Sequence, residues 1–198
     1  MEGHRYFLLH KPIDMVSQFV SSHQVRLLDA IDFDFPPGTH AIGRLDQNSE
    51  GLLLLTTDKK ITKLLFQSIK PHTRTYLVQV KYIVSPDTVC KLAKGVPISA
   101  PFGGHYMTSP CEVQLVNKPS FIKDPVIPLH EKITNSWLTI TLTEGKFHQV
   151  RKMVAAVNHK CIRLIRISIE DLMLGDLEPG EVKEVSRDYF YEKLKLIE

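Results

Sequence analysis

The chain has 198 residues, of which 43% are hydrophobic and 24% are charged. This balance is typical of one or two folded globular domains and excludes a disordered or fibrous protein. The longest wholly apolar run, Met153 to Val157, is far too short to span a bilayer. The formal net charge of +3 allows an anionic partner without requiring one.

The three cysteines, Cys90, Cys111 and Cys161, are odd in number and widely spaced. This pattern argues against a secreted disulfide framework, and the lack of a C-x-x-C pair argues against a zinc site. The first residues also lack the apolar stretch of a signal peptide. We therefore expect a cytoplasmic protein with no metal and no membrane segment.

The first third of the chain alternates short apolar segments with breaks. Arg5 to His10 predicts a strand that ends before Pro12, and Val25 to Ile31 predicts a short helix. Gly51 to Thr57 is a continuous apolar run that ends in two threonines, which is typical of a strand buried on both faces. Asp58 then has the position of a helix cap, and the following helix would bury Ile61, Leu64 and Leu65.

The middle of the chain is more irregular. Thr75 to Tyr82 alternates as a half-buried strand does, and a helix is expected to begin at Ser85-Pro86-Asp87. Pro97 to Pro110 is rich in proline and glycine and predicts a loop. Cys111 to Val116 predicts a strand, and Lys118 to Asn135 forms the longest irregular stretch, a linker or a substrate-contacting loop.

The last third changes period twice. Trp137 to Thr143 alternates as a strand, whereas Phe147 to Asn158 has the 3.6-residue period of a helix. Cys161 to Ile169 predicts another strand, and Arg187 to Leu196 predicts a terminal helix. Strands outnumber helices and lack the regular βαβ rhythm, so we expect an α+β fold with a mostly antiparallel or mixed central sheet flanked by helices.

Basic residues gather near the helix predicted at 147–158. Within about twenty residues lie Lys146, His148, Arg151, Lys152, His159, Lys160, Arg163 and Arg166. Such a cluster is typical of a nucleic-acid-binding surface. The alternative that the pattern leaves open is an ordinary solvated helix face.

Three segments could carry chemistry. The polar loop Gly43 to Gly51 contains an Arg-Leu-Asp triplet, in which Asp46 could be catalytic or could simply cap a turn. Glu144 to Met153 joins a strand to a basic helix and could bind phosphate, or could be a plain turn. Tyr76 could act on a substrate, although periodicity alone favours a core position.

The order of these motifs resembles that of the bacterial ribosomal RNA pseudouridine synthases. The resemblance is to the branch with small-subunit synthase A and large-subunit synthases B, E and F, and most to the synthase E group. Its strongest element is Gly-Arg-Leu-Asp-x-x-Ser-Glu-Gly-Leu-Leu-Leu-Leu-Thr at positions 43–56. Arg74-Thr75-Tyr76, the E-G-K-x-x-Q-V-R-K-M element at 144–153 and Ile162 to Arg166 follow in the same order.

The resemblance implies a pseudouridine synthase catalytic fold with an active-site cleft across the sheet. Most relatives carry an S4-type RNA-binding domain ahead of this fold, and we expect none here because the first catalytic strand begins near Arg5. The expected organisation is a single catalytic domain over 1–198. Its alternative is a division into two subdomains, about 1–70 with part of the C-terminus, and 71–185.

The resemblance also implies roles for individual residues. Asp46 would be the nucleophile or base, Arg151 the cation that keeps the carboxylate ionised, and Tyr76 the residue that stacks on the target uracil. Leu164 would pack against the reaction pocket, and Arg44 would either occupy the space left by the extruded base or hold the phosphate of the flipped nucleotide. The remaining residues expected to bind RNA are Lys146, His148, Gln149, Lys152 and Arg163.

The implied reaction converts one uridine of large-subunit (23S) ribosomal RNA into pseudouridine, with no cofactor and no metal. The expected partner is ribosomal RNA, and the expected state is a monomer. Two alternatives stay open: the same reaction on another structured RNA, and an RNA-binding ribosome assembly factor without catalysis. A metal-dependent hydrolase is disfavoured, since no pair of the nine histidines has metal-ligand spacing with an acidic third ligand.

Overall fold

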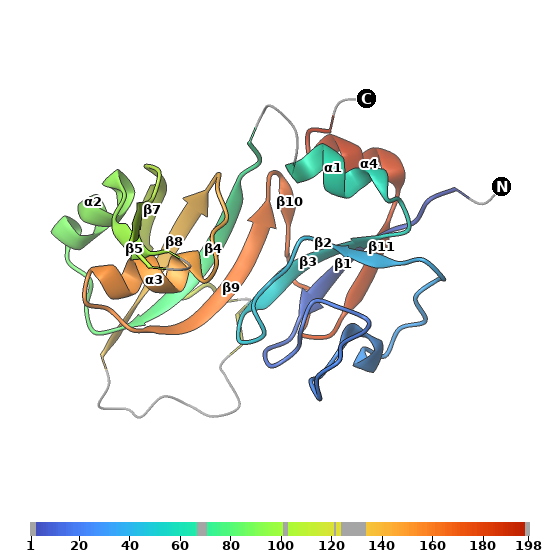
Figure 1. The fold of residues 1–198 in the computed structure, drawn as a ribbon, viewed down its shortest axis with the longest axis horizontal. Helices are drawn as coiled ribbons and strands as arrows, with labels where there is room; N and C mark the ends of the chain where they lie inside the picture. The colour runs from blue at the N-terminus through green and yellow to red at the C-terminus, as the bar shows by residue number, and fades with distance from the viewer. Residues whose placement is uncertain (1–2, 67–70, 101–102, 121, 124–133, 197–198) are drawn as a thin grey trace. The chain divides into compact units, whose positions relative to one another are not determined.

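The computed structural model describes residues 3–66, 71–100, 103–120, 122–123 and 134–196 (Figure 1). Contacts divide the chain into two compact units. Unit 1 comprises Met1–Arg74 and Ile165–Glu198, and unit 2 comprises Thr75–Leu164. The chain therefore leaves unit 1 within one strand, β4 (Arg74–Lys81), and returns within another, β9 (Cys161–Ile169).

Unit 1 is built around strand β3, which pairs antiparallel with β1 and β2. β11 pairs with β1, β10 pairs with β9, and the first two residues of β3 pair in parallel with β9. The elements of this unit besides β9 are β1 (Tyr6–Lys11), the 3-10 turn η1 (Leu28–Ala30), β2 (His40–Ile42), β3 (Glu50–Thr56), α1 (Lys60–Phe66), β10 (Leu172–Met173), β11 (Val182–Val185) and α4 (Arg187–Lys193).

Unit 2 has the strand order β9, β4, β8, β7, with β5 and β6 as a separate antiparallel hairpin. Its elements besides β4 and β9 are α2 (Pro86–Lys94), β5 (Pro97–Ser99), β6 (His105–Met107), β7 (Glu112–Val116), β8 (Asn135–Leu142) and α3 (Gln149–Ala156). Antiparallel and parallel strand pairs occur in one chain together with helices. The predicted α+β class with a mixed sheet is therefore confirmed.

The cores follow the periodicity of the sequence. All seven residues of β3 are buried, as expected for a strand covered on both faces. In unit 2 the buried face of α3 packs in one hydrophobic cluster with the inward residues of β8. These residues are Val150, Met153, Val154, Leu138, Ile140 and Leu142. The helical and strand patterns of this region are thus confirmed.

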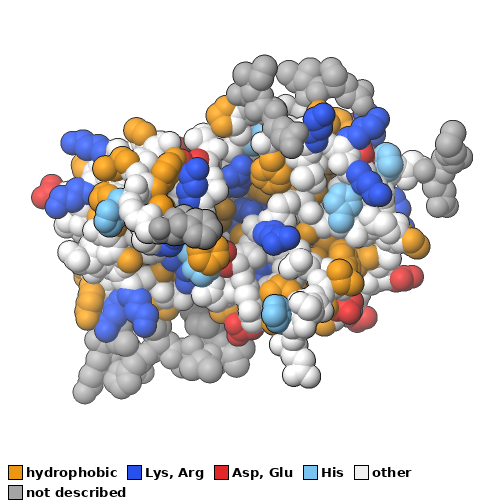
Figure 2. Space-filling view, viewed as in Figure 1, with side chains coloured by type: hydrophobic (Ala, Val, Ile, Leu, Met, Phe, Trp, Pro, Cys, Tyr) orange, Lys and Arg blue, Asp and Glu red, His pale blue; other side chains and the backbone are white. Residues whose placement is uncertain are grey.

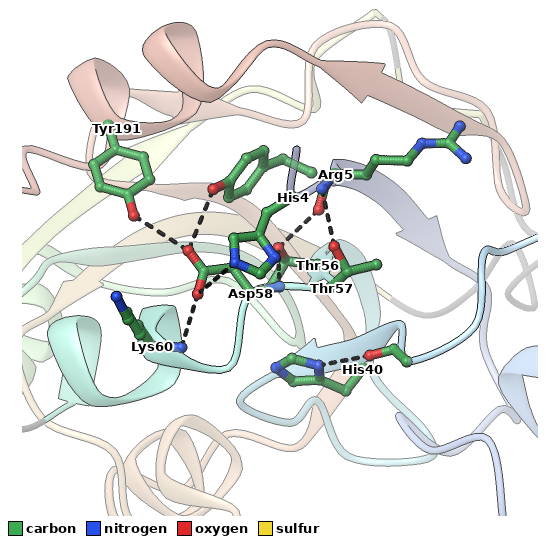
Figure 3. Close-up of polar contacts among 10 residues, drawn as sticks. His4, Arg5, His40, Thr56, Thr57, Asp58, Lys60 and Tyr191 are labelled. Atoms are coloured by element: carbon green, nitrogen blue, oxygen red, sulfur yellow. Dashed lines mark hydrogen bonds and ion pairs between the residues drawn. The ribbon is translucent and has the colours of Figure 1, made fainter. Parts of the chain in front are cut away.

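Asp58 links three elements of unit 1 (Figure 3). Its carboxylate accepts the Lys60 N–H at 3.0 Å, which confirms the predicted cap of α1. It also accepts the Tyr6 hydroxyl from β1 at 3.3 Å and the Tyr191 hydroxyl from α4 at 3.4 Å. Burial, Tyr191 and Asp58 raise the pKa of Tyr6 far above its ordinary value, so the phenol stays neutral and remains a donor.

Two local predictions were wrong. Val25 to Ile31 forms only the three-residue turn η1, because too few residues follow the helical period to complete a helix. Pro97 to Pro110 contains the β5–β6 hairpin in addition to residues outside the described part. Proline is tolerated there because Pro97 is the first residue of a strand.

Candidate active site

Asp46 lies in the connection between β2 and β3 of unit 1. The neighbouring Leu45 is buried, and Ser17 binds both of its backbone groups. The Leu45 N–H donates to Ser17 Oγ at 3.0 Å, and Ser17 Oγ lies 3.1 Å from the Leu45 carbonyl oxygen. The Ser49 N–H donates to the Asp46 carbonyl oxygen at 3.0 Å. The backbone is therefore fixed on both sides of Asp46, while its side chain is partly exposed.

A buried lysine supports this loop. Lys11, the last residue of β1, is 0% exposed and donates through Nζ to three backbone carbonyls. These belong to Pro12 at 2.8 Å, Met15 at 2.6 Å and Gln47 at 3.3 Å. Because an ammonium carries three protons, each acceptor can be matched by one donor. Gln47 directly follows Asp46, so Lys11 joins the end of β1 to the loop.

Charge near Lys11 connects it electrostatically to Asp46. Burial lowers the pKa of Lys11 to about 8, whereas Glu50, Asp14 and Asp46 act in the opposite direction. The effect of Asp46 means that its carboxylate lies close enough to stabilise the ammonium.

Close backbone approach explains the second glycine of the motif at 43–56. Gly51 has a φ of +106°, and a Cβ there would lie 2.3 Å from the Arg166 carbonyl oxygen. Arg166 is itself buried and donates through Nε to the Leu52 carbonyl at 2.8 Å. Only glycine fits this close crossing of β3 and β9. The glycine therefore serves the scaffold that carries the loop.

We expect Lys11→Met to lower the free energy of unfolding by about 2–4 kcal/mol, because the buried Met15 carbonyl and the part-buried Pro12 and Gln47 carbonyls lose their donor. The native pKa of Lys11 is about 8 and its ordinary value is 10.5. Between these pH values the unfolded chain binds more protons, so the stability of the wild type rises with pH relative to Lys11→Met. Urea unfolding at pH 7 and pH 9.5 measures both effects.

Lys183→Met is the matched control for this experiment, because Lys183 is an exposed lysine on β11. It should change neither the stability nor its pH dependence. A stability gap between wild type and Lys11→Met that stays constant from pH 7 to pH 9.5 would contradict the lowered pKa.

Tyr76 lies near the start of β4 in unit 2. The four residues after it, Leu77 to Val80, are buried, whereas Tyr76 is partly exposed. Its ring packs against the hydrophobic cluster of the unit. The ring is thus held by the core and still has accessible surface.

Arg151 lies on α3, whose opposite face is anchored in the core. Val150, Met153 and Val154 are buried, and Arg151 is partly buried. Its guanidinium donates through an Nη to Cys161 Sγ at 3.7 Å, which places it beside the first residue of β9. Burial raises the pKa of Cys161 to about 11, although Arg151 acts in the opposite direction. The neighbour of Arg151 is therefore a neutral thiol.

Glu144 organises the turn that leads into α3. Its carboxylate accepts the Tyr106 hydroxyl at 2.5 Å, the Ser109 N–H at 3.0 Å and the Gln149 amide at 2.6 Å. The side-chain oxygen of Gln149, Oε1, accepts the backbone N–H of Lys146 at 2.8 Å. Burial disfavours the anion, yet these hydrogen bonds lower the pKa of Glu144. An ionised Glu144 therefore joins the β6 strand to the start of α3.

The other residues predicted to bind RNA differ in their surroundings. Arg44 and Lys146 are exposed, His148 directly precedes α3, and Gln149 is buried in the Glu144 network. Lys152 Nζ donates to the Ser99 carbonyl at 2.8 Å, and Arg163 donates to the Lys123 carbonyl at 2.6 Å. Leu164 is buried in the hydrophobic cluster of unit 2.

The predicted site residues belong to both units. Arg44 and Asp46 lie in unit 1, and the remaining ones, including Tyr76 and Arg151, lie in unit 2. Among the described residues, no three His, Cys, Asp or Glu side chains are grouped so that they could hold a metal ion. The described part of the chain also contains no helix with the length and apolarity needed to cross a membrane.

Sequence reasoning missed two supporting residues. Lys11 lies just after the strand predicted at Arg5 to His10, and nothing in its local pattern reveals that the side chain is buried. Glu144 stood inside the motif at 144–153, but its partners Tyr106 and Ser109 are more than thirty residues away. The presence of an acidic residue within a basic segment was the available signal for a structural role.

Comparison with known proteins gives consistent results. A family model described as RNA pseudouridylate synthase matches residues 5–156. Ribosomal large subunit pseudouridine synthase E of Vibrio parahaemolyticus is 34% identical over 186 residues, covering 93% of this chain and 75% of the relative. Ribosomal small subunit pseudouridine synthase A of Escherichia coli K12 is 32% identical over 187 residues, covering 94% of this chain and 72% of the relative. A crystal structure of a pseudouridylate synthase matches with a TM-score of 0.76 and 27% identity, covering 98% of this chain and 75% of that one.

Proposed function

Since the chain belongs to the RNA pseudouridylate synthase family and is an RNA pseudouridine synthase, we propose that it converts a specific uridine of large-subunit (23S) ribosomal RNA into pseudouridine. The observation that most supports this target is the 34% identity to large-subunit synthase E over 93% of the chain. The fixed backbone around Asp46 supports the placement of the chemistry in the β2–β3 loop, where a carboxylate has a rigid support.

The proposed reaction breaks the bond between N1 of the uracil and C1′ of the ribose. The uracil then rotates, C5 forms the new bond to C1′, the C5 proton leaves and N1 gains a proton. Atoms and electrons balance within the nucleotide, so the reaction needs no redox partner. Asp46 acts as a nucleophile toward C1′ or as a base toward the sugar, because bond cleavage leaves an electron-poor ribose.

We assign the remaining roles from this chemistry. Arg151 is the fixed cation that keeps the Asp46 carboxylate ionised in a site closed to water. Tyr76 stacks on the target uracil and relays the C5 proton through its hydroxyl. Arg44 occupies the space that the extruded base leaves in the RNA.

The other predicted contacts divide by environment. Lys146, His148, Lys152 and Arg163 lie on or near exposed segments of unit 2 and bind backbone phosphates. Gln149 acts indirectly, because its amide is held by Glu144 and the Lys146 backbone. Leu164 supports the pocket from the core. The protein works as a monomer in the cytoplasm, and the unpaired state of all three cysteines agrees with a reducing compartment.

Small-subunit ribosomal RNA is a second candidate substrate, because synthase A of Escherichia coli is 32% identical over 94% of this chain. The two candidates share the reaction and differ only in the RNA that is bound. The choice therefore depends on RNA-contacting segments rather than on Asp46.

The deciding experiment measures tritium release from RNA labelled at C5 of uridine. We expect release from unmodified large-subunit RNA, at most one site per molecule, and none from unmodified small-subunit or transfer RNA. Mapping of the pseudouridine then identifies the nucleotide. Release from small-subunit RNA alone would move the target to the second candidate, and silence of all three RNAs would favour a non-catalytic assembly factor.

A further inference from the structure

An aromatic side chain is presented to solvent beside α3. Phe147 is 66% exposed, although the helix that follows it is anchored through Val150 and Met153. Exposure of most of a phenylalanine side chain is unfavourable in a free protein, because water contacts an apolar surface. The ring is therefore available to a partner on a segment that the core holds in place.

Phe147 already takes part in a stack. Its ring lies parallel to the His148 imidazole, with centroids 3.9 Å apart and planes 16° apart. His148 adopts a left-handed backbone with a φ of 53° immediately before α3. This conformation sets the direction of both rings, so the stack is oriented by the start of the helix.

Two lysine ammonium groups of this segment lie over aromatic rings. Lys152 Nζ lies 5.4 Å from the centroid of Phe147, and Lys146 Nζ lies 4.5 Å from that of Tyr106. The carboxylate of this segment, Glu144, is occupied by donors from Tyr106, Ser109 and Gln149. Figure 2 shows that Lys and Arg side chains dominate the charged groups on the face it presents. Aromatic rings beside cations are the combination that binds unpaired nucleic-acid bases and their phosphates.

We propose that Phe147 is a stacking residue for an unpaired base of the RNA substrate, with Lys146 and Lys152 binding the adjoining phosphates. This inference rests on the proposed function, because it takes RNA as the partner. Because Tyr76 is assigned to the target uracil, the base that stacks on Phe147 is a different, unpaired base of the substrate. An apolar protein partner is disfavoured because the Lys152 ammonium lies beside the ring and the exposed Lys146 directly precedes it in the chain.

A tryptophan reporter tests the contact directly. The chain has a single tryptophan, Trp137, which is 8% exposed. In Phe147→Trp a new exposed indole should be quenched when unmodified large-subunit rRNA is added, because bases stack on it. The fluorescence of the wild type gives the Trp137 background. A reporter whose emission does not change at saturating RNA would overturn the proposal.

Ile83→Trp is the matched control, because Ile83 is 67% exposed and lies in the same unit. Two side-chain hydrogen bonds show that β4 and β8 run antiparallel. They join Thr75 to Thr141 and Gln79 to Asn135. Ile83 follows the end of β4 and Phe147 follows the end of β8. The two positions therefore lie at opposite ends of eight-residue strands, roughly 25 Å apart. Equal quenching of both reporters would indicate nonspecific coating and would also overturn the proposal.

Affinity measurements supply the second test. We expect Phe147→Ala and Phe147→Leu to weaken RNA binding about 5- to 150-fold, and Phe147→Tyr to retain it. The salt dependence should not change, because no cation is removed. Binding by Phe147→Leu equal to that of the wild type would contradict stacking. These readouts require no turnover, so a wild type that binds RNA without releasing tritium would refute the proposed function while leaving this inference testable.

Discussion

We expect Asp46→Asn to abolish tritium release, with a loss of at least about 10³-fold relative to the wild type. Asparagine keeps the shape of the side chain but provides neither a nucleophilic oxygen anion nor a base. The fold should persist, because Ser17, Lys11 and Ser49 make hydrogen bonds to the backbone of the loop, and asparagine leaves these groups unchanged. Single-turnover tritium release and RNA-binding affinity measure the two parts of this expectation.

Asp14→Asn is the matched control for Asp46→Asn. Asp14 is exposed, lies in the same unit and, like Asp46, raises the pKa of Lys11. It should therefore reproduce the electrostatic effect on Lys11 while it retains turnover. A tenfold or larger loss of activity in both variants would show that charge near Lys11, rather than chemistry at Asp46, limits the reaction.

Arg151→Met should reduce turnover by about 100-fold or more while the protein stays folded. Methionine fills much of the volume of arginine, and the helix is anchored by Val150, Met153 and Val154 on its other face. Methionine carries no charge, so the cation that we assign to the reaction is lost. Tritium release and a thermal melting curve separate the loss of activity from a loss of fold.

A conservative variant and a matched control complete this experiment. Arg151→Lys should recover only part of the rate, because an ammonium lacks the planar array of donors. Arg187→Met removes an exposed arginine from α4 and should leave turnover unchanged. Wild-type turnover by a folded Arg151→Met protein would refute the role assigned to Arg151.

Elements with a long and regular pattern could be predicted from the sequence. β9 was expected at Cys161–Ile169 and has these bounds, because its apolar residues continue through the whole strand. The β5–β6 hairpin was missed because its composition is that of a loop. What stabilises it lies elsewhere: Thr108 and Val96 exchange two hydrogen bonds, and Gly95 packs against the Thr108 carbonyl.

The parts of the candidate site that depend on a local sequence pattern could be predicted. The motif at 43–56 identified the Asp46 loop, and the helical period identified the side of α3 that carries Arg151. The burial of Lys11 and the Glu144 network were not predictable, because both depend on contacts between distant segments. A local pattern contains no information on which carbonyl a lysine will reach once the chain has folded.

The division of the chain between the two units has a consequence for the order of folding. Thr75–Leu164 forms unit 2 without interruption, so this segment can form its own contacts as soon as it has been synthesised. Unit 1 must instead bring Met1–Arg74 together with Ile165–Glu198 across the intervening ninety residues. If unit 2 folds first, its compact body replaces a long flexible loop and lowers the entropic cost of that closure. The Asp46 loop precedes unit 2 in the chain, yet the scaffold that supports it is completed last, when β9 reaches Gly51.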